Sequence, residues 1–289
     1  MTVAMDDSSP RGAANFEVRP LSAVAGAEVI GLDLALPLDV GTRAAVYDAF
    51  VRHHVLAFRD QRLDKARQVA FSEQFGALER HTIRNRGADH PLVHTVTNLD
   101  GAGRPSGRVA STRWHTDKSF RPQPSLATIL HAIRLPPAGG DTLFANMHLA
   151  WEELGEAERA ELGKLRVVHS WEQSRLKIGE RASEAEIRDA PARVHPLVRR
   201  HPDTDRECLF MGEHASHFEG RRIAEGRARL AELEAHATAK RFVFRHRWRP
   251  GDVVMWDNRC LLHRADQNFD AARHARVMHR TCLRGTAPA

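Results

Sequence analysis

The sequence predicts a mainly β fold, an antiparallel jelly-roll core with inserted and flanking helices. Short apolar runs bounded by Gly, Pro and Asp are typical of strands, and they occur along most of the chain. Helical spacing appears only between groups of such runs, without the regular strand-helix alternation of a parallel sheet. With 289 residues the chain can form one large domain, predicted over 16–289 after a flexible tail at 1–15.

The first third of the chain predicts two short strands followed by two helices. Strands are expected in 16–21 and 27–34, and helical apolar spacing covers 40–55 and 66–78, the second helix ending near Gly76. Residues 80–107 are rich in Gly, Asn and Asp, and only 92–98 are strand-like. This composition predicts a loop region over a site.

The rest of the chain alternates strands with surface helices. A buried strand starts at Ser125, a turn covers 136–142, and a further strand follows. Charged segments with helical spacing lie at 147–165 and 225–239. Strict alternation of side chains in 241–248 predicts a strand, as do the apolar residues 253–256 and the segment 274–283.

Composition narrows the class of protein. No apolar run is long enough to cross a bilayer and the first residues carry no apolar core of a signal peptide, so a cytoplasmic protein is expected. Cys208, Cys260 and Cys282 are far apart, which argues against a disulfide framework and a thiolate zinc site and favours reduced, buried thiols. The 38 arginines against five lysines suit recognition of carboxylates. Their dispersal among acidic residues argues against nucleic acid as a ligand.

The segment RWHTDKSF, 113–120, places a histidine and an aspartate two residues apart. On an extended chain His115 and Asp117 point the same way and can converge on one metal ion. With the later His263 they make two histidines and one carboxylate, the facial triad of non-haem Fe(II) oxygenases. Among 18 histidines this spacing also arises by chance. Six further histidines are not assigned to a metal: His195, His201, His214, His217, His246 and His279.

Two arginines lie four residues apart near the end of the chain. On a strand Arg276 and Arg280 share one face, and His279 points the other way. A buried pair of guanidinium groups implies bound anions, because each can hold a carboxylate bidentately. An exposed face with two solvated arginines is the alternative.

Four ordered motifs resemble the taurine dioxygenase and 2,4-dichlorophenoxyacetate dioxygenase family of Fe(II)/2-oxoglutarate-dependent oxygenases. They are WHTD-x-SF at 114–120, LPPAGGDT at 135–142, WDNRCLLHRA at 256–265, and Arg276 thirteen residues after His263. The similarity covers 16–283, and its later half is particularly similar to the 2,4-dichlorophenoxyacetate branch. It implies a cupin-like double-stranded β-helix, the jelly-roll core already predicted.

The resemblance also implies roles for single residues. His115, Asp117 and His263 would bind the catalytic Fe(II), while Thr142 and Arg276 would hold the far carboxylate of 2-oxoglutarate, with O2 as the second co-substrate. Arg280 matches an arginine that contacts either the anionic group of the substrate or the near carboxylate of 2-oxoglutarate, and both readings stay open.

The substrate expected from the resemblance is a small organic anion. The best match is an aryloxyalkanoate such as 2,4-dichlorophenoxyacetate, cleaved to a phenol and a 2-oxo acid while succinate and CO2 form. His81 stands where taurine-cleaving members keep a histidine for the sulfonate, so a taurine, sulfonate or alkylsulfate dioxygenase is the alternative. Arg84, Arg86 and Ser111 are further candidate substrate contacts. A homo-oligomer, dimer or tetramer, is expected as in other members.

Two other classes of protein are compatible with part of the pattern. A zinc hydrolase could use the same H-x-D pair and histidine, but it does not need Thr142 and Arg276. A nucleic-acid binder requires a clustered basic patch. Among the aromatic residues, Trp114 and Phe120 are candidates for a substrate pocket, whereas Trp248 and Trp256 are expected in the core.

Overall fold

The computed structural model describes residues 16–80 and 90–289 and confirms the jelly-roll prediction. The expected tail at 1–15 and the candidate contacts His81, Arg84 and Arg86 lie outside the described residues. In the described part of the chain no helix is long and apolar enough to span a membrane.

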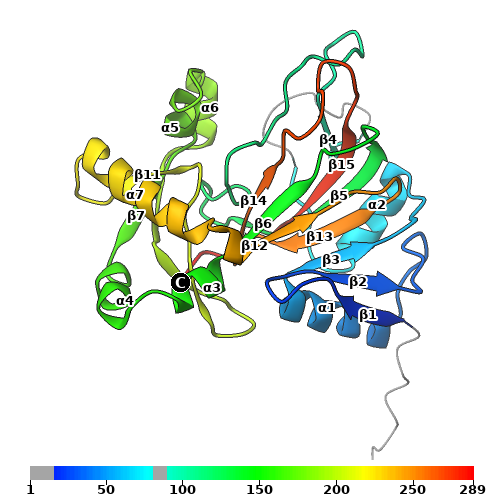
Figure 1. Cartoon of the computed structure of the whole chain (residues 1–289), viewed down its shortest axis with the longest axis horizontal. Helices are drawn as coiled ribbons and strands as arrows, with labels where there is room; N and C mark the ends of the chain where they lie inside the picture. Colours follow the sequence, from blue (N-terminus) through cyan, green and yellow to red (C-terminus); the bar gives the residue numbers. More distant parts are fainter. Residues whose placement is uncertain (1–15, 81–89) are drawn as a thin grey trace, which may run out of the picture.

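A large mixed sheet carries one half of the molecule, to the right in Figure 1. Within the described residues it has seven strands, antiparallel except for the pair β2 and β3. In spatial order they are β1 (Glu17–Pro20), β2 (Ala27–Ile30), β3 (Val55–Phe58), β13 (Val253–Asp257), β5 (Ser125–Arg134), β15 (Val277–Arg284) and β4 (His94–Thr97).

The large sheet is buried on both faces, and its strands show the expected period of two. In β13, Val254 and Trp256 join the cluster between the sheets, while Val253 and Met255 join a second cluster under the helices. That second cluster is completed by α1 (Val40–His53) and α2 (Lys65–Glu73), which cover the outer face (Figure 1).

The structure corrects the predicted helix ends. The segment predicted as one helix over 40–55 ends at His53, because His54 adopts a left-handed conformation (φ 62°) and β3 starts at Val55. The second helix ends at Glu73, three residues before Gly76. Periodicity alone cannot place such ends, since apolar residues continue from helix into strand.

A smaller sheet faces the large one and closes the jelly roll. Its strands in the described residues are β12 (Val243–His246), β6 (Thr142–Asn146) and β14 (Leu261–Ala265), in that order. The predicted turn before Thr142 is present, and Gly140 has a φ of 72°, a conformation that favours glycine. A Cβ there would lie 3.3 Å from Cδ of Arg276, so the turn lets that side chain pass closely.

Between β6 and β12 the chain leaves the jelly roll and builds the left half of Figure 1. Its elements are α3 (Met147–Glu152), α4 (Glu156–Leu162), β7 (Arg166–His169), α5 (Trp171–Leu176), α6 (Glu184–Asp189), β8 (Arg193–Pro196), β9 (Val198–Arg200), β10 (Glu207–Leu209), β11 (Ala215–Phe218), α7 (Ile223–Ala237) and the short 3-10 helix η1 (Lys240–Phe242). The strands of this insertion have no counterpart among the predicted elements.

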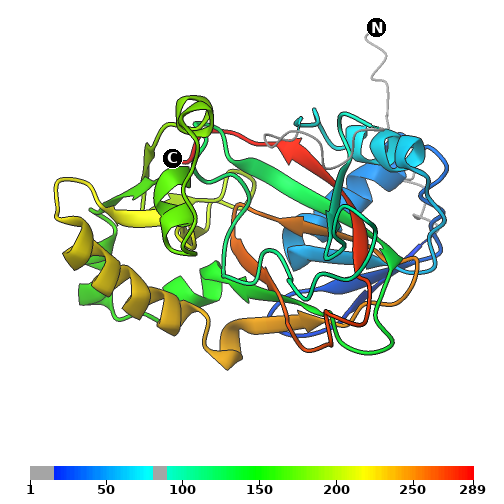
Figure 2. The same cartoon turned by 90° about the horizontal axis from the view of Figure 1, so that it is seen from above.

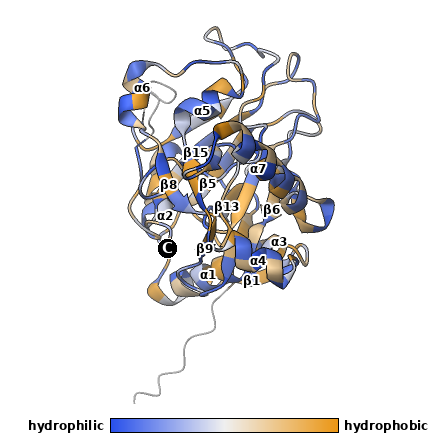
Figure 3. Ribbon diagram, turned by 90° about the vertical axis from the view of Figure 1, so that its left-hand side faces the viewer, coloured by the Kyte–Doolittle hydropathy of each residue, from blue (hydrophilic) through white to orange (hydrophobic). Residues whose placement is uncertain are grey.

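The insertion packs on the jelly roll from the side in both views (Figures 1 and 2). The hydropathy colouring separates its hydrophilic helix α7 from the hydrophobic strand β13 of the core (Figure 3). Trp248 and Trp256 are buried, as predicted for core residues. The C-terminal residue returns to the insertion, where Arg200 N donates to the carbonyl of Ala289 at 2.9 Å.

Candidate functional site

The H-x-D segment lies against β14, and this contact brings the two motifs together. His115 and His263 exchange main-chain hydrogen bonds of 3.0 and 2.8 Å, so their side chains leave the backbone side by side. Their imidazole centroids are 4.1 Å apart. Nε2 of His115 lies 4.0 Å and Nε2 of His263 lies 3.8 Å from the Asp117 carboxylate. We call His115, Asp117 and His263 the triad.

Second contacts fix the orientation of two side chains of the triad, His115 and Asp117, whereas Nδ1 of His263 is buried without a hydrogen-bond partner among the described residues. Nδ1 of His115 is 2.8 Å from the carbonyl of Arg113, so Nδ1 carries the proton and Nε2 presents its lone pair. The hydroxyl of Thr128 donates to Asp117 Oδ2. Asn258, from the WDNR motif, donates in turn to Thr128 at 2.9 Å. The triad is therefore arranged before any ion arrives.

The charge state of Asp117 also suits a cation. Burial raises the pKa of a carboxyl group, yet the neighbouring Arg280 together with His263 and His115 outweighs burial and lowers the pKa of Asp117 well below its usual range. Burial lowers the pKa of His263 well below 6.5, and His115 adds to this. Two neutral imidazoles and one carboxylate can hold a divalent metal with three positions left open.

Arg276 and Thr142 form a second polar corner of the site. Nε of Arg276 donates to the carbonyl of Gly140 at 2.9 Å, and its terminal nitrogen lies 3.5 Å from the Thr142 hydroxyl. Trp248 Nε1 donates to the same hydroxyl at 3.0 Å. Arg276 is 5% exposed, and no carboxylate of the described residues lies within 4 Å of it. Burial lowers its pKa to about 10.

A buried guanidinium without a carboxylate partner costs free energy, so the arrangement favours an incoming anion. A cavity opens beside Arg276, lined by Val96, Thr97, Asn98, Val109, Ala110 and Phe269. Asn98 Oδ1 accepts from the main-chain nitrogen of Arg276 at 2.7 Å and fixes the start of β15.

Arg280 points into the same site, and the structure therefore favours the buried reading of the arginine pair over the solvated one. Its NH1 lies 3.3 Å from Asp117 Oδ1, and its side chain is 15% exposed. A bulge in the pairing with β5 lies between Val277 and Met278, at the start of β15. Both arginines nevertheless reach the site, one at the triad and one at Thr142.

An aromatic group flanks the segment that carries the triad. Phe120 contacts His214 and Trp171, with centroids 4.8 and 5.2 Å apart. The loop holding His214 runs along the H-x-D segment, because Glu213 N donates to the carbonyl of Trp114 at 2.8 Å. Gly212 makes this approach possible, since a Cβ there would lie 3.1 Å from Cα of His115.

Sequence reasoning missed the neighbours that come from outside the motifs. Thr128 stands in a buried strand, and Trp171 and His214 stand in the insertion, so no spacing signal connects them with His115. Asn258 lies inside the WDNR motif, but the motif alone does not indicate its contact with Thr128. Ser111 is exposed with a φ of 60°, and its carbonyl accepts from Ala265 N at 2.8 Å at the end of β14.

A jelly roll with two histidines and one carboxylate at its centre, beside a buried arginine, is typical of the non-haem Fe(II) oxygenases. Comparison with known proteins identifies the family. Residues 17–282 match the taurine catabolism dioxygenase TauD, TfdA family, and the chain belongs to that family.

Two relatives are named as 2,4-dichlorophenoxyacetate dioxygenases. The alpha-ketoglutarate-dependent 2,4-dichlorophenoxyacetate dioxygenase of Burkholderia sp. (strain RASC) is 40% identical over 79% of this chain and 81% of its own. That of Cupriavidus pinatubonensis is 38% identical over 91% of this chain and 96% of its own. The crystal structure of AAD-2 in complex with Mn(II) and N-oxalylglycine superposes with a TM-score of 0.85, at 33% identity over 94% and 99% of the two chains.

The chain is therefore an Fe(II)- and 2-oxoglutarate-dependent dioxygenase, with O2 as co-substrate. The predicted fold, enzyme class and cofactors are confirmed. The zinc hydrolase and the nucleic-acid binder are set aside by the same comparisons.

Proposed function

We propose that this dioxygenase hydroxylates aryloxyalkanoates such as 2,4-dichlorophenoxyacetate at the carbon beside the ether oxygen. Such a product is a hemiacetal, which collapses to a phenol and a 2-oxo acid. The observation that carries the proposal is the similarity to the 2,4-dichlorophenoxyacetate dioxygenases over 79% and 91% of the chain. An (S)-phenoxypropionate dioxygenase of Delftia acidovorans, 35% identical over 94% of the chain, supports the same substrate class.

The triad is our proposed iron site. Its three ligand atoms lie within 4.8 Å of one another, and the His115 tautomer and the ionised Asp117 already have the protonation states that a metal requires. When bound, Fe(II) with 2-oxoglutarate and O2 supplies the oxidant for C–H hydroxylation, and 2-oxoglutarate leaves as succinate and CO2.

Thr142 and Arg276 are our proposed contacts for the far carboxylate of 2-oxoglutarate. The guanidinium offers a planar set of donors, and the hydroxyl adds one more donor. Because Gly140 and Asn98 fix Arg276 at its Nε and its main-chain nitrogen, the carboxylate meets a preorganised partner. The chain thereby orients its co-substrate relative to the triad.

Arg280 is proposed to hold a carboxylate at the triad, either from the substrate or from the near end of 2-oxoglutarate. The Arg280 guanidinium already faces Asp117, so an incoming anion and Asp117 would both interact with its positive charge. Phe120, Trp171 and His214 offer an aromatic surface beside the triad segment for an aryl ring. His81, Arg84, Arg86 and Ser111 remain proposed substrate contacts from the sequence.

A sulfate ester or sulfonate is the second candidate substrate. An alpha-ketoglutarate-dependent sulfate ester dioxygenase of Pseudomonas putida is 33% identical over 96% of the chain. The same hydroxylation beside an ester oxygen would release sulfate, and the arginines would bind that anion equally well.

We further infer a single domain over 16–289, because the family similarity spans 17–282 and hydrophobic clusters join its two halves. A cytoplasmic location and a homo-oligomeric state, dimer or tetramer, are proposed from the sequence and the family.

The test is succinate production by the purified chain, loaded anaerobically with Fe(II) and then given 2-oxoglutarate and O2. The panel contains aryloxyacetates, aryloxypropionates, taurine and alkyl sulfates, with His115→Ala as the inactive control. We expect succinate to rise with an aryloxyalkanoate, in step with release of its phenol. Turnover of a sulfate ester alone would select the second candidate, and turnover of no member would contradict both.

A further inference from the structure

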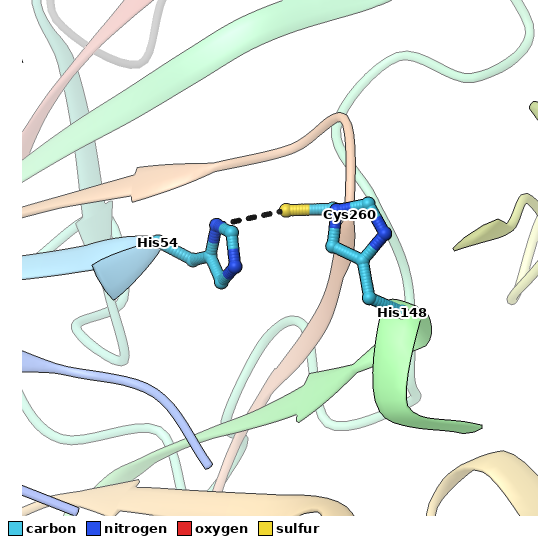
Figure 4. Close-up of side chains that lie close together, drawn as sticks. All are labelled: His54, His148 and Cys260. Carbon is cyan, nitrogen blue, oxygen red and sulfur yellow. Dashed lines mark hydrogen bonds between the residues drawn. The ribbon is translucent and has the colours of Figure 1, made fainter. Parts of the chain in front are cut away.

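A second cluster of metal-ligating side chains lies in the core and shares no residue with the triad. His54 follows α1, His148 lies in α3, and Cys260 lies in the turn between β13 and β14 (Figure 4). One ligand atom from each lies within 4.8 Å of the other two. The three residues are 4%, 0% and 1% exposed. We call them the histidine–cysteine cluster.

The protonation pattern leaves one nitrogen without a partner. Nδ1 of His148 is 2.8 Å from the carbonyl of Glu207 and must donate to it, so Nε2 of His148 carries a lone pair. Nε2 is buried and has no hydrogen-bond partner. Sγ of Cys260 and Nδ1 of His54 lie 3.4 Å apart and are joined by one hydrogen bond. Figure 4 shows the two imidazoles on either side of the Cys260 side chain.

A buried lone pair without a donor is costly, and a cation bound between the three side chains would remove this cost. The spacing fits such an ion. Zinc lies about 2.3 Å from a thiolate and about 2.0 Å from an imidazole, which places sulfur and nitrogen about 3.5 Å apart in a tetrahedral site. The distance from Cys260 Sγ to His54 Nδ1 is 3.4 Å.

The main chain holds the ligands in place. Met147 N donates to the carbonyl of Cys260 at 3.0 Å, and Asp257 N donates to the carbonyl of His54 at 2.9 Å. The hydrogen bond from His148 Nδ1 to a carbonyl is the outer contact commonly made by metal-bound histidines. His54 itself occupies a left-handed conformation that few residues other than glycine adopt, which brings its ring toward the sulfur.

We propose that His54, His148 and Cys260 bind a zinc ion that fastens α1, α3 and the β13–β14 turn together. Two imidazoles and one thiolate are a donor set for a borderline to soft ion such as zinc, whereas hard ions prefer oxygen ligands. Because the cluster is enclosed in the core, its ion is structural and does not turn over substrate.

The surroundings of the cluster can balance the charge of an ion. Asp257 accepts from both Arg259, at 2.8 and 2.7 Å, and His201, at 3.0 Å. Arg259 also donates to Asp203 at 2.6 Å, so two carboxylates face this one guanidinium. The ring of His201 also lies next to that of His148, with centroids 5.7 Å apart, while its Nε2 donates to Asp257.

Binding of Co(II) tests the proposal, because a thiolate bound to Co(II) gives a charge-transfer band in the near ultraviolet. Co(II) at the triad would not give this band, because the triad has no thiolate. We expect the full-length wild-type chain to develop this band and saturate at one thiolate-bound ion. His148→Gln should raise the Co(II) concentration at half saturation more than about tenfold. Cys260→Ser should abolish the band, and zinc should displace cobalt from the wild type.

Cys208→Ser is the matched control, because Cys208 is equally buried but donates its thiol proton to the carbonyl of Arg259. It should leave the band unchanged. No band in the wild type, or a band that survives Cys260→Ser, would overturn the proposal. If Cys260→Ser does not fold by circular dichroism, the wild-type spectrum and His148→Gln still decide it.

Discussion

The triad and the histidine–cysteine cluster are two versions of one arrangement. Each combines two imidazoles with one ionisable third ligand, and each has a histidine whose Nδ1 lies 2.8 Å from a carbonyl oxygen. The two sites are also close in sequence, because Cys260 lies in the turn between β13 and β14 and His263 follows three residues later in β14. They differ in the third ligand and in what surrounds them.

The third ligand and the neighbouring charges explain why we propose a catalytic iron site at the triad and a structural zinc site at the cluster. Asp117 offers hard oxygen atoms beside Arg280, and Arg276 lies at Thr142 in the same site, so two guanidinium groups can bind anionic ligands of the metal. Cys260 offers a soft sulfur inside an enclosed core, with buried Arg199 and Arg259 among the neighbouring charges. Two histidines can therefore serve a catalytic metal site or a structural one. Which of the two they serve depends on the third ligand and on whether substrates can reach the metal.

The largest expected effect separates the two sites directly. Asp117→Ala removes one of the three proposed iron ligands, so we expect succinate formation to fall by more than about a hundredfold, beyond what loss of an outer contact costs. The thiolate band with Co(II) should persist, because the cluster is intact. A succinate assay measures the activity of the triad, and the Co(II) spectrum measures metal binding at the cluster. Asp48→Ala, on the exposed face of α1, is the control, and simultaneous loss of both signals would show that the sites are not independent.

The next effect concerns Arg276 and Thr142, the proposed contacts for the far carboxylate of 2-oxoglutarate. Arg276→Met keeps the length of the side chain but removes its charge, so the KM for 2-oxoglutarate should rise about 10- to 100-fold, as expected for loss of a charged hydrogen bond. The value of kcat at saturating 2-oxoglutarate should change much less. Steady-state kinetics with exposed Arg247→Met as the control check this. An unchanged KM would remove Arg276 from the co-substrate site.

A smaller effect concerns stability and the cluster alone. Zinc that binds only the folded chain stabilises it by mass action, and at about 100 times the dissociation constant this raises Tm by roughly 5 °C. Thermal unfolding of the Asp117→Ala variant with and without zinc avoids binding at the triad. Adding Cys260→Ser to that variant should remove the shift, and a shift that remains would place the zinc elsewhere.

The smallest effect is the pH dependence of the metal-free chain. Burial lowers the pKa of His148 from 6.5 to about 4. Between these values the unfolded chain takes up a proton that the folded chain does not, so stability falls as the pH drops from 6.5 toward 4. The slope from this residue is at most about 1.4 kcal/mol per pH unit. Urea unfolding at several pH values should show a shallower slope for His148→Gln, but not for partly buried His274→Gln.

The sequence was sufficient to predict the jelly roll, and it singled out three residues, His115, Asp117 and His263, that the structure brings together. Period-two patterns reflect the pleat of a strand, and H-x-D places two ligands on one side of an extended chain. The spacing of Arg276 and Arg280 likewise indicated a shared face, which the structure bears out. These signals are local or belong to ordered motifs, so they can be recognised in the sequence alone.

The insertion and the histidine–cysteine cluster were not predictable in the same way. His54, His148 and Cys260 are separated by about a hundred residues each, and only the packing of α1, α3 and the β13–β14 turn brings them together. The absence of closely spaced cysteines argued against a thiolate zinc site, and the proposed site uses one cysteine whose partners come from distant parts of the chain. The short strands of the insertion lack long periodic runs, so no pattern placed them.

The most direct test of the account is the visible charge-transfer band that forms when Fe(II) and 2-oxoglutarate bind together without oxygen. We predict this band for the wild type, its loss in His115→Ala, and its recovery in Arg276→Met only at higher 2-oxoglutarate. A band of wild-type strength in His115→Ala, or no band in the wild type, would contradict the assignment of the triad as the iron site.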